Sequence, residues 1–206
     1  MANTYVYIDG FNLYYGAVRG TPYKWLDIGA LCKTMLPTDN ILSIKYFTAK
    51  VKGRRHDPDK PIRQQIYFRA LKTIPHLDII HGHFLTKPCR MVLSKSDPMK
   101  WVWVDRTDEK GSDVNLASYL LHDGFRGLYD IAVVISNDSD LQEPIRMVRQ
   151  VLNKPVGIIN PHPTNSTALT PYASFIKRIR QSNIIASQFP DTLTDAKGAF
   201  ERPSRW

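Results

Sequence analysis

Four aspartates stand at positions where folding could bring their carboxylates together: Asp9, Asp113, Asp138 and Asp140. The first follows the apolar run 4–8, and the last two follow the apolar run 131–135. Asp113 lies in the opening turn of an expected helix. Ligands of an open α/β sheet bind outside the carboxyl ends of its strands. If the two apolar runs are neighbouring strands, we expect these carboxylates to converge at that edge of the sheet.

Each of these acids also has a purely structural explanation. Asp9 could belong to a turn, and Asp113 could stabilise a helix N-terminus electrostatically. Asp138 or Asp140 could cap the next helix, with Glu143 completing a capping box. Their conjunction favours a metal site, because clustered carboxylates raise one another's pKa unless a cation lies among them. Oxygen ligands without Cys or His suit Mg²⁺ or Mn²⁺, and one ion can bridge Asp9 and Asp138 only if their carboxylates lie within about 10 Å.

An acidic metal site in a basic protein is suited to cutting nucleic acid. The 206-residue chain has a formal net charge of +9, which favours polyanionic partners. A metal would activate water and neutralise the phosphate, while basic side chains hold the flanking backbone. Basic residues gather in two places, at Lys50, Lys52, Arg54 and Arg55 and at Lys177, Arg178 and Arg180. We expect Arg54 and Arg55 to bind the substrate through its phosphates.

The apolar pattern predicts one α/β domain with a mostly parallel sheet, because short apolar runs alternate with helical patterns. Strands are expected at 4–8, 41–51, 77–85, 131–135 and 156–159, and helices at 27–35, 61–71, 112–123, 140–152 and 169–181. Residues 87–107 resemble a small inserted hairpin. We therefore expect one domain over residues 1–185, followed by a C-terminal tail at 186–206.

Composition also bears on the compartment. No apolar run reaches the roughly 18 residues that a membrane span needs, so we expect no membrane partner. The first residues enter a strand pattern directly, which leaves no room for a signal peptide. The two cysteines, Cys32 and Cys89, lack metal-ligand spacing, and so few cysteines are typical of a reducing compartment. These features predict a cytoplasmic protein.

Three segments that contain the acids resemble the motifs of NYN domains, which are PIN-like nucleases in the group that includes the LabA-like proteins. The segments are 7–13 (YIDGFNL), 110–116 (KGSDVNL) and 133–141 (VVISNDSDL). They occur in this order within the first 160 residues. The resemblance implies a Rossmann-like, PIN-type three-layer fold and metal-dependent cleavage of RNA that leaves 5′-phosphates.

By the same resemblance, the catalytic acids and the ligands of Mg²⁺ or Mn²⁺ are Asp9, Asp113, Asp138 and Asp140. Asn12 would orient the first acid or touch the substrate, and Ser136 would hydrogen-bond a carboxylate or a phosphate. Two positions depart from the family pattern. Asn137 stands where many relatives have glycine, and Tyr119 stands where many have a further acid. Asp123 could replace that acid or could only cap a helix end.

The main prediction is a metal-dependent endoribonuclease acting on single-stranded or structured RNA, with DNA left open as a substrate. One alternative is a non-catalytic RNA-binding or regulatory protein that retains the acidic pocket. A metal-dependent phosphatase is a weaker alternative, because the Asp-x-Asp motif expected after the first strand is absent. His81 and His83 would share one side of a strand as a candidate metal pair. Trp101 and Trp103 could stack on bases or pack against the domain.

Overall fold

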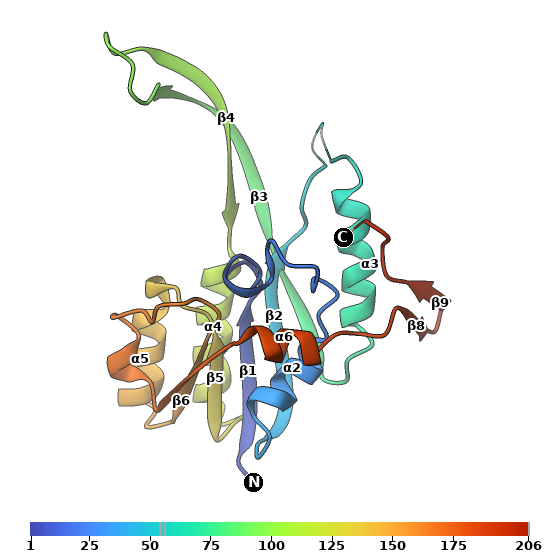
Figure 1. Cartoon of the computed structure of the whole chain (residues 1–206). Coiled ribbons are helices and arrows are strands. Elements are labelled where there is room, and N and C mark those ends of the chain that lie inside the picture. Colours follow the sequence, from blue (N-terminus) through green and yellow to red (C-terminus); the bar gives the residue numbers. More distant parts are fainter. Residues whose placement is uncertain (54, 56, 206) are drawn as a thin grey trace.

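The structure, a computed structural model, describes residues 1–53, 55 and 57–205. At its centre is a seven-stranded sheet with the order β4-β3-β2-β1-β5-β6-β7 (Figure 1). All neighbouring strands are parallel except β3 and β4. The strands are β1 (Asn3–Asp9), β2 (Asn40–Ala49), β3 (Leu77–Val92), β4 (Trp101–Lys110), β5 (Ile131–Ile135), β6 (Val156–Asn160) and β7 (Phe175–Arg178).

Helices cover both faces of the sheet and complete a three-layer α/β fold. One face packs against α2 (Ile28–Met35), α3 (Lys60–Leu71) and α6 (Gln181–Ala186), and the other against α4 (Ser112–Phe125) and α5 (Gln142–Gln150). Side chains alternate between the faces of a strand, so Val6 and Ile8 join the first core while Tyr7 joins the second. Among the described helices, none is long and apolar enough to cross a membrane.

The order of the strands reverses at β1. From β1 the chain builds β2 and β3 on one side, and it later adds β5 and β6 on the other. Residues 4–8 of β1 pair in parallel with residues 131–135 of β5. The two apolar runs are therefore neighbouring strands, which was the condition for the carboxylates to converge. The carboxyl ends of β1 and β5 therefore form the kind of switch point at which open α/β sheets bind ligands.

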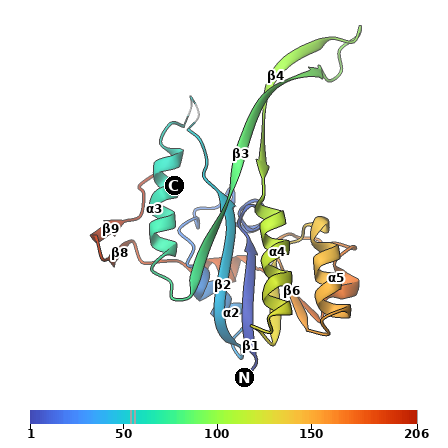
Figure 2. The same ribbon diagram turned by 180° about the vertical axis from the view of Figure 1, so that it is seen from behind.

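A long two-stranded arm projects from one edge of the sheet (Figures 1 and 2). The first part of β3, residues 77–82, pairs with β2, and residues 83–92 pair with β4. The expected strand at 77–85 and the expected hairpin at 87–107 are thus parts of one continuous ribbon. The inserted hairpin is confirmed, but its first strand is also a strand of the central sheet.

The expected helix over residues 169–181 is wrong. A short 3₁₀ helix (Thr170–Tyr172) is followed by the edge strand β7, and α6 begins only at Gln181. The apolar spacing of this segment suits a helix, but the open edge of β6 offers backbone hydrogen bonds, and β7 pairs with it from Phe175 to Arg178. Pairing across the sheet therefore overrides the local pattern.

Residues 186–206 also contain regular structure. The strands β8 (Thr192–Asp195) and β9 (Gly198–Glu201) form a small antiparallel pair. Phe189 and Phe200 are buried in the same core as α2 and α3. The Arg69 side chain of α3 binds both carboxylate oxygens of Asp195 at 2.7 Å. Residues 189–201 are consequently packed onto the domain.

Candidate metal centre

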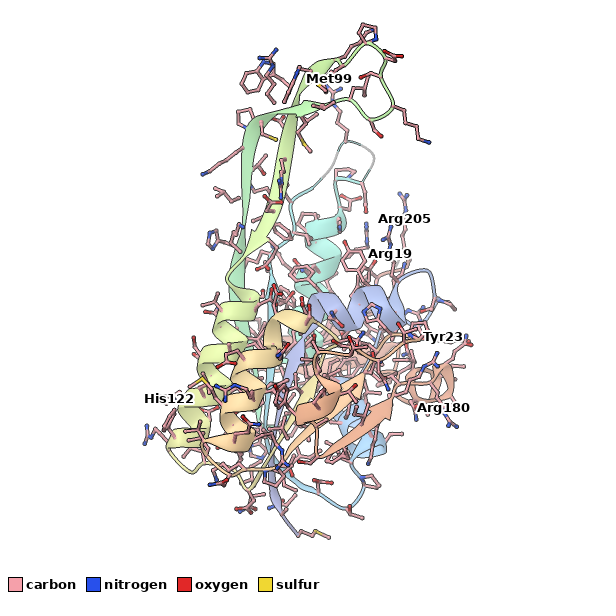
Figure 3. All side chains as sticks on the ribbon, turned by 90° about the vertical axis from the view of Figure 1, so that its left-hand side faces the viewer. Arg19, Tyr23, Met99, His122, Arg180 and Arg205 are labelled. Carbon is pink, nitrogen blue, oxygen red and sulfur yellow. The ribbon has the colours of Figure 1, made fainter. Side chains whose placement is uncertain are left out.

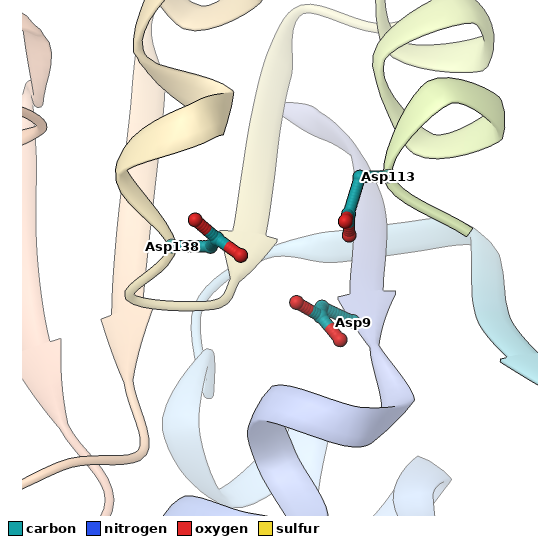
Figure 4. Close-up of side chains that lie close together, drawn as sticks. All are labelled: Asp9, Asp113 and Asp138. Atoms are coloured by element: carbon teal, nitrogen blue, oxygen red, sulfur yellow. The ribbon is translucent and has the colours of Figure 1, made fainter. Parts of the chain in front are cut away.

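Three carboxylates meet at the carboxyl edge of the sheet (Figure 4). Asp9 ends β1, Asp138 follows β5, and Asp113 lies in the first turn of α4. One oxygen from each of the three lies within 4.8 Å of the others. Asp9 is only 4% exposed, whereas the other two are partly buried. The distance is well inside the limit of about 10 Å that a shared ion requires.

Asp9 is held by hydrogen bonds from two directions. The backbone N–H of Asn12 donates to Asp9 Oδ1 at 2.9 Å, because Asp9 caps the short helix α1 (Gly10–Leu13). The hydroxyl of Ser136 donates to Asp9 Oδ2 at 3.1 Å. Burial raises the pKa of Asp9, these two hydrogen bonds oppose the rise, and the charge of Asp138 adds to it. The carboxylate is thus oriented but costly to keep charged without a cation.

Gly10 has a packing role beside this acid. A Cβ atom at this position would lie 2.7 Å from the carbonyl oxygen of Phe47 and 2.7 Å from the ring of Tyr46. The first turn of α1 therefore approaches β2 too closely for any side chain. The Asp-Gly pair, which could have been an ordinary turn, instead lets a helix begin directly at the acid.

The loop after β5 positions Asp138. Its Oδ1 accepts a hydrogen bond from the backbone N–H of Asp140 at 3.0 Å, and its own N–H donates to Ser136 Oγ at 3.1 Å. The backbone N–H of Asn137 donates to the side-chain oxygen of Asn12 at 2.9 Å. The loops after β1 and β5 are therefore tied together, which fixes the two acids relative to each other.

Asp113 is the acid most affected by its neighbours. Burial raises its pKa to about 6, with further contributions from the charges of Asp9, Asp138, Glu109 and Asp140. Gly111, immediately before α4, has a φ of 97°, which glycine adopts readily. The sharp turn at this residue places the first turn of α4, with Asp113, beside the other two acids. A cation among the three carboxylates would favour their charged forms and so oppose this rise in the pKa of Asp113.

Comparison with known proteins identifies the family of this arrangement. The model of the NYN domain matches residues 3–179. The chain belongs to the NYN domain family. The match includes all three acids of the cluster and both loops that hold them.

Two individual proteins resemble this NYN domain. The enzyme 6-hydroxy-3-succinoylpyridine 3-monooxygenase HspA of Pseudomonas putida is 31% identical over 236 residues, which cover 98% of this chain and 75% of that protein. A crystal structure of a protein of unknown function from Vibrio parahaemolyticus superposes with a TM-score of 0.57 at 17% identity, covering 87% of this chain and 93% of the other. The second likeness shows the fold alone.

The other residues expected in the site differ in how close they lie to the three acids. Asp140 is exposed and its carboxylate is outside the group of three, although its charge contributes to the raised pKa of Asp113. Asn12 joins the loops after β1 and β5, and Ser136 donates a hydrogen bond to Asp9. Arg55 is exposed in the loop before α3, whereas Arg54 lies outside the described residues.

Asp123 belongs to a separate buried network. Its Oδ2 accepts hydrogen bonds from the Tyr7 hydroxyl, at 2.8 Å, and from Lys45 Nζ. Tyr119, which stands where relatives have an acid, packs its ring 4.9 Å from Lys45 Nζ and 5.9 Å from the ring of Phe47. This part of the NYN domain is therefore built as a core of tyrosines around an ion pair.

The pocket at the acids contains two ionisable side chains that sequence reasoning missed, Glu109 and His162. It has a volume of about 370 Å³ and is lined by Asp9, Phe11, Asn12, Tyr15, Phe84, Glu109, Asp113, Asp138 and His162. Glu109 accepts hydrogen bonds from the Ser112 N–H at 3.2 Å and its hydroxyl at 2.8 Å. Its position directly before the segment 110–116 was a usable signal. His162 comes from a loop after β6, and no spacing in the sequence points to it.

The donor set suits a hard divalent cation. Ligand oxygens about 2.1 Å from an octahedral Mg²⁺ lie about 3.0 Å apart when adjacent and about 4.2 Å apart when opposite. A group within 4.8 Å needs only small side-chain movements to reach those values. All three donors are carboxylates, which favours Mg²⁺ or Mn²⁺ over zinc. Among the described residues, His81 and His83 join no such group.

Proposed function

We propose that this NYN domain is a metal-dependent endoribonuclease that hydrolyses RNA phosphodiester bonds with Mg²⁺ or Mn²⁺. The observation that carries the proposal is the group formed by Asp9, Asp113 and Asp138 at the carboxyl edge of the sheet. Membership of a nuclease-type family supports it. The net charge of +9 suits a polyanionic substrate.

The residues of the cluster have distinct tasks in this reaction. A divalent cation, when bound, lowers the pKa of water and neutralises charge on the phosphate. Asp9, held in place by Ser136 and by the start of α1, would supply one oxygen ligand to that cation. Asp113, with a pKa of about 6, must lose its proton before the site can hold a cation. Asp138 completes the set, and Asp140 remains a proposed fourth acid that would reach the site through water.

Binding of the RNA backbone is assigned to residues around the cluster. Asn12 lines the pocket and is the side chain that we propose for contact with the substrate. Ser136 is fully buried, so it acts through Asp9 instead of touching RNA. Arg55, and with it Arg54, would contact flanking phosphates from the loop before α3.

The proposed compartment is the cytoplasm. Cys32 and Cys89 are both free thiols, and Cys32 is fully buried in the core. Free cysteines in this number are typical of proteins kept in a reducing environment.

A direct assay tests the activity. Purified protein of this sequence is incubated with end-labelled single-stranded RNA, structured RNA and single-stranded DNA, each with Mn²⁺, with Mg²⁺ or with EDTA. We expect cleavage of RNA with either cation and none with EDTA. Tight RNA binding without cleavage under any condition would instead identify a non-catalytic RNA-binding protein. Preferential cleavage of DNA would correct the substrate.

A second candidate function follows from the relative HspA, which is named as a monooxygenase of a substituted pyridine. A cavity of about 390 Å³ lies beside the acids, with Phe11, Tyr15 and Phe84 shared between the two pockets. Its other walls include the aromatic Tyr46, Tyr67 and Phe68 and the basic Lys24, Lys60 and Arg63, the last of which is paired with Asp57 of the same lining. This volume and lining suit an aromatic acid.

The second candidate needs its own assay, because monooxygenation consumes O₂ and a two-electron donor. Oxygen uptake would be measured with 6-hydroxy-3-succinoylpyridine and NADH, in the presence and absence of Mn²⁺. Product formation that persists in Asp113→Asn would favour this function over RNA cleavage. No oxygen uptake, together with metal-dependent RNA cleavage, would reject it.

A further inference from the structure

We propose that one face of the β3–β4 arm binds unpaired bases of the RNA strand that enters the acidic pocket. This face, called the tryptophan face below, consists of Phe84, Thr86, Pro88, Arg90 and Val92 of β3 and Trp101, Trp103, Asp105, Thr107 and Glu109 of β4. The proposal rests on the proposed function, because it concerns the same substrate. It adds a second binding surface at a distance from the cut.

The tryptophan face connects the acids with the tip of the arm. Directly paired residues of antiparallel strands share a face, and alternate residues continue it. Phe84 pairs with Glu109, and both line the pocket around the acids. The same face then runs through the pair Thr86–Thr107, whose hydroxyls lie 3.0 Å apart, towards the paired residues Arg90 and Trp103.

The indole rings at the far end are open to solvent. Trp101 is 52% exposed and Trp103 is 73% exposed, so packing against the domain, one of the two roles considered for them, is wrong. The guanidinium of Arg90 lies 5.4 Å from the centre of the Trp101 ring. Met99, between the two strands, marks the tip of the arm, far from the helices of the domain (Figure 3). Exposed flat rings beside a cation are suited to stacking on bases.

The length of the face sets the size of the RNA that would reach it. Phe84 and Val92 are eight residue steps apart along β3, which corresponds to about 27 Å at ~3.4 Å per residue. Stacked nucleotides advance about 3.4 Å each along a strand. A strand bound at the acids must therefore extend by roughly eight nucleotides to reach the tryptophans, or by fewer if it is stretched.

Charge argues for nucleic acid as the occupant. Residues 90–103, the part of the arm that carries the tryptophans, contain three basic side chains and one acidic one. The two acids of the tryptophan face, Asp105 and Glu109, lie nearer the pocket. A second copy of this chain, with its net charge of +9, would bring like charges together along such an arm. A single strand fits better than a duplex, because stacking on an indole needs an unpaired base.

The opposite face of the arm provides a matched control. It carries Leu85, Lys87, Cys89 and Met91 of β3 and Val102, Val104, Arg106 and Asp108 of β4. Val102 and Val104 alternate with the two tryptophans on the same strand. Replacing both valines perturbs the same stretch of ribbon without touching the tryptophan face.

The test measures binding of a 16-nucleotide and a 4-nucleotide single-stranded RNA, in EDTA so that nothing is cut. We compare the wild-type chain, Trp101→Ala/Trp103→Ala, Val102→Ala/Val104→Ala and Trp103→Phe. Loss of stacking typically weakens binding by about 5- to 150-fold per base. We therefore expect at least tenfold weaker binding of the longer RNA by the tryptophan double variant only. The 4-nucleotide RNA should bind all variants equally, and Trp103→Phe should stay within a fewfold of wild type.

Cleavage in Mn²⁺ separates this proposal from the proposed function. Wild-type cleavage together with unchanged affinity of the tryptophan double variant would overturn the arm proposal and leave the nuclease intact. Tryptophan-dependent binding of the longer RNA without any cleavage would support the arm and overturn the nuclease. Equal losses in the valine control, or a change only in oligomeric state measured by ultracentrifugation, would also overturn the arm proposal.

Discussion

The hydroxyl of Ser136 donates a hydrogen bond to Oδ2 of Asp9 at 3.1 Å, joining the ends of the neighbouring strands β5 and β1. The same hydroxyl oxygen accepts the backbone N–H of Asp138 at 3.1 Å. Ser136 is fully buried. One small side chain therefore sets the position of two of the three acids.

Replacing Ser136 with alanine should weaken the metal site without abolishing the fold. Loss of an outer-shell hydrogen bond to a metal ligand typically lowers metal affinity or activity by about 10- to 100-fold. The free energy of unfolding should fall by only about 1 kcal/mol. Titration calorimetry with Mn²⁺ measures the first effect and urea unfolding the second. Ser139→Ala, at an exposed position in the same loop, is the control, and equal Mn²⁺ affinity in both variants would contradict the role of Ser136.

Asp113→Asn should separate catalysis from structure. The change keeps the shape of the side chain but removes one negative charge from the cluster, so cleavage should fall by orders of magnitude. RNA affinity and melting temperature without metal should hold or rise, because repulsion among the acids is relieved. If Asp113 only stabilises the helix start, the free energy of unfolding of Asp113→Asn should instead be about 0.3–1 kcal/mol lower than that of the wild type, and cleavage should be unchanged. Asp78→Asn, an exposed residue on β3, controls for charge.

Protonation of Asp113 should make both the stability without metal and the affinity for Mn²⁺ depend on pH. Its pKa is about 6 in the folded protein against an ordinary value of 3.8. The folded state therefore binds more protons than the unfolded chain between these values, and stability without metal should decrease as pH rises from about 4 to above 6. Melting temperatures in EDTA across this range measure the effect, which should be smaller in Asp113→Asn. Mn²⁺ affinity should increase from pH 5 to pH 7, since the cation competes with the proton.

The buried pair of Lys45 and Asp123 should matter for stability alone. Asp123 is 3% exposed, and its carboxylate also binds the Tyr7 hydroxyl. Asp123→Ala leaves Lys45 charged and unpaired, so the free energy of unfolding should fall by about 3–5 kcal/mol. Mn²⁺ affinity, measured below the melting temperature, should be unchanged. Loss of Mn²⁺ binding in a variant that remains folded would show that Asp123 serves the metal site after all. Lys45→Met/Asp123→Leu should restore much of the stability.

RNA affinity should fall steeply with salt through contacts near α3. Arg54→Ala/Arg55→Ala should flatten the slope of log K against log[salt] by roughly one to two units. Binding releases fewer counterions from the RNA when two phosphate contacts are lost. Filter binding in EDTA at several KCl concentrations gives the slope. Arg178→Ala/Arg180→Ala is the comparison, and a change of slope only in that variant would move the phosphate contacts to the β7 edge.

Local sequence was sufficient to predict the edge of the sheet at which the three aspartates meet. Asp9 and Asp138 each follow a short, continuous apolar run, and such runs are buried strands whose carboxyl ends must lie at one edge when they are parallel. Asp113 opens a helix after a glycine, and the three motifs resembled one family. These features depend on residues close in the chain, so they can be read without knowing the tertiary structure.

Tertiary structure alone decided the features that depend on partners distant in the chain. Residues 175–178 became a strand because β6 offered an open edge, against their helical spacing. Asp123 was directed to Tyr7 and Lys45, which are 116 and 78 residues away in sequence. The exposure of Trp103 and the approach of His162 to the acids likewise depend on where whole elements lie. Apolar periodicity records which side of an element is buried, but the partner across the core is chosen only when the elements pack together.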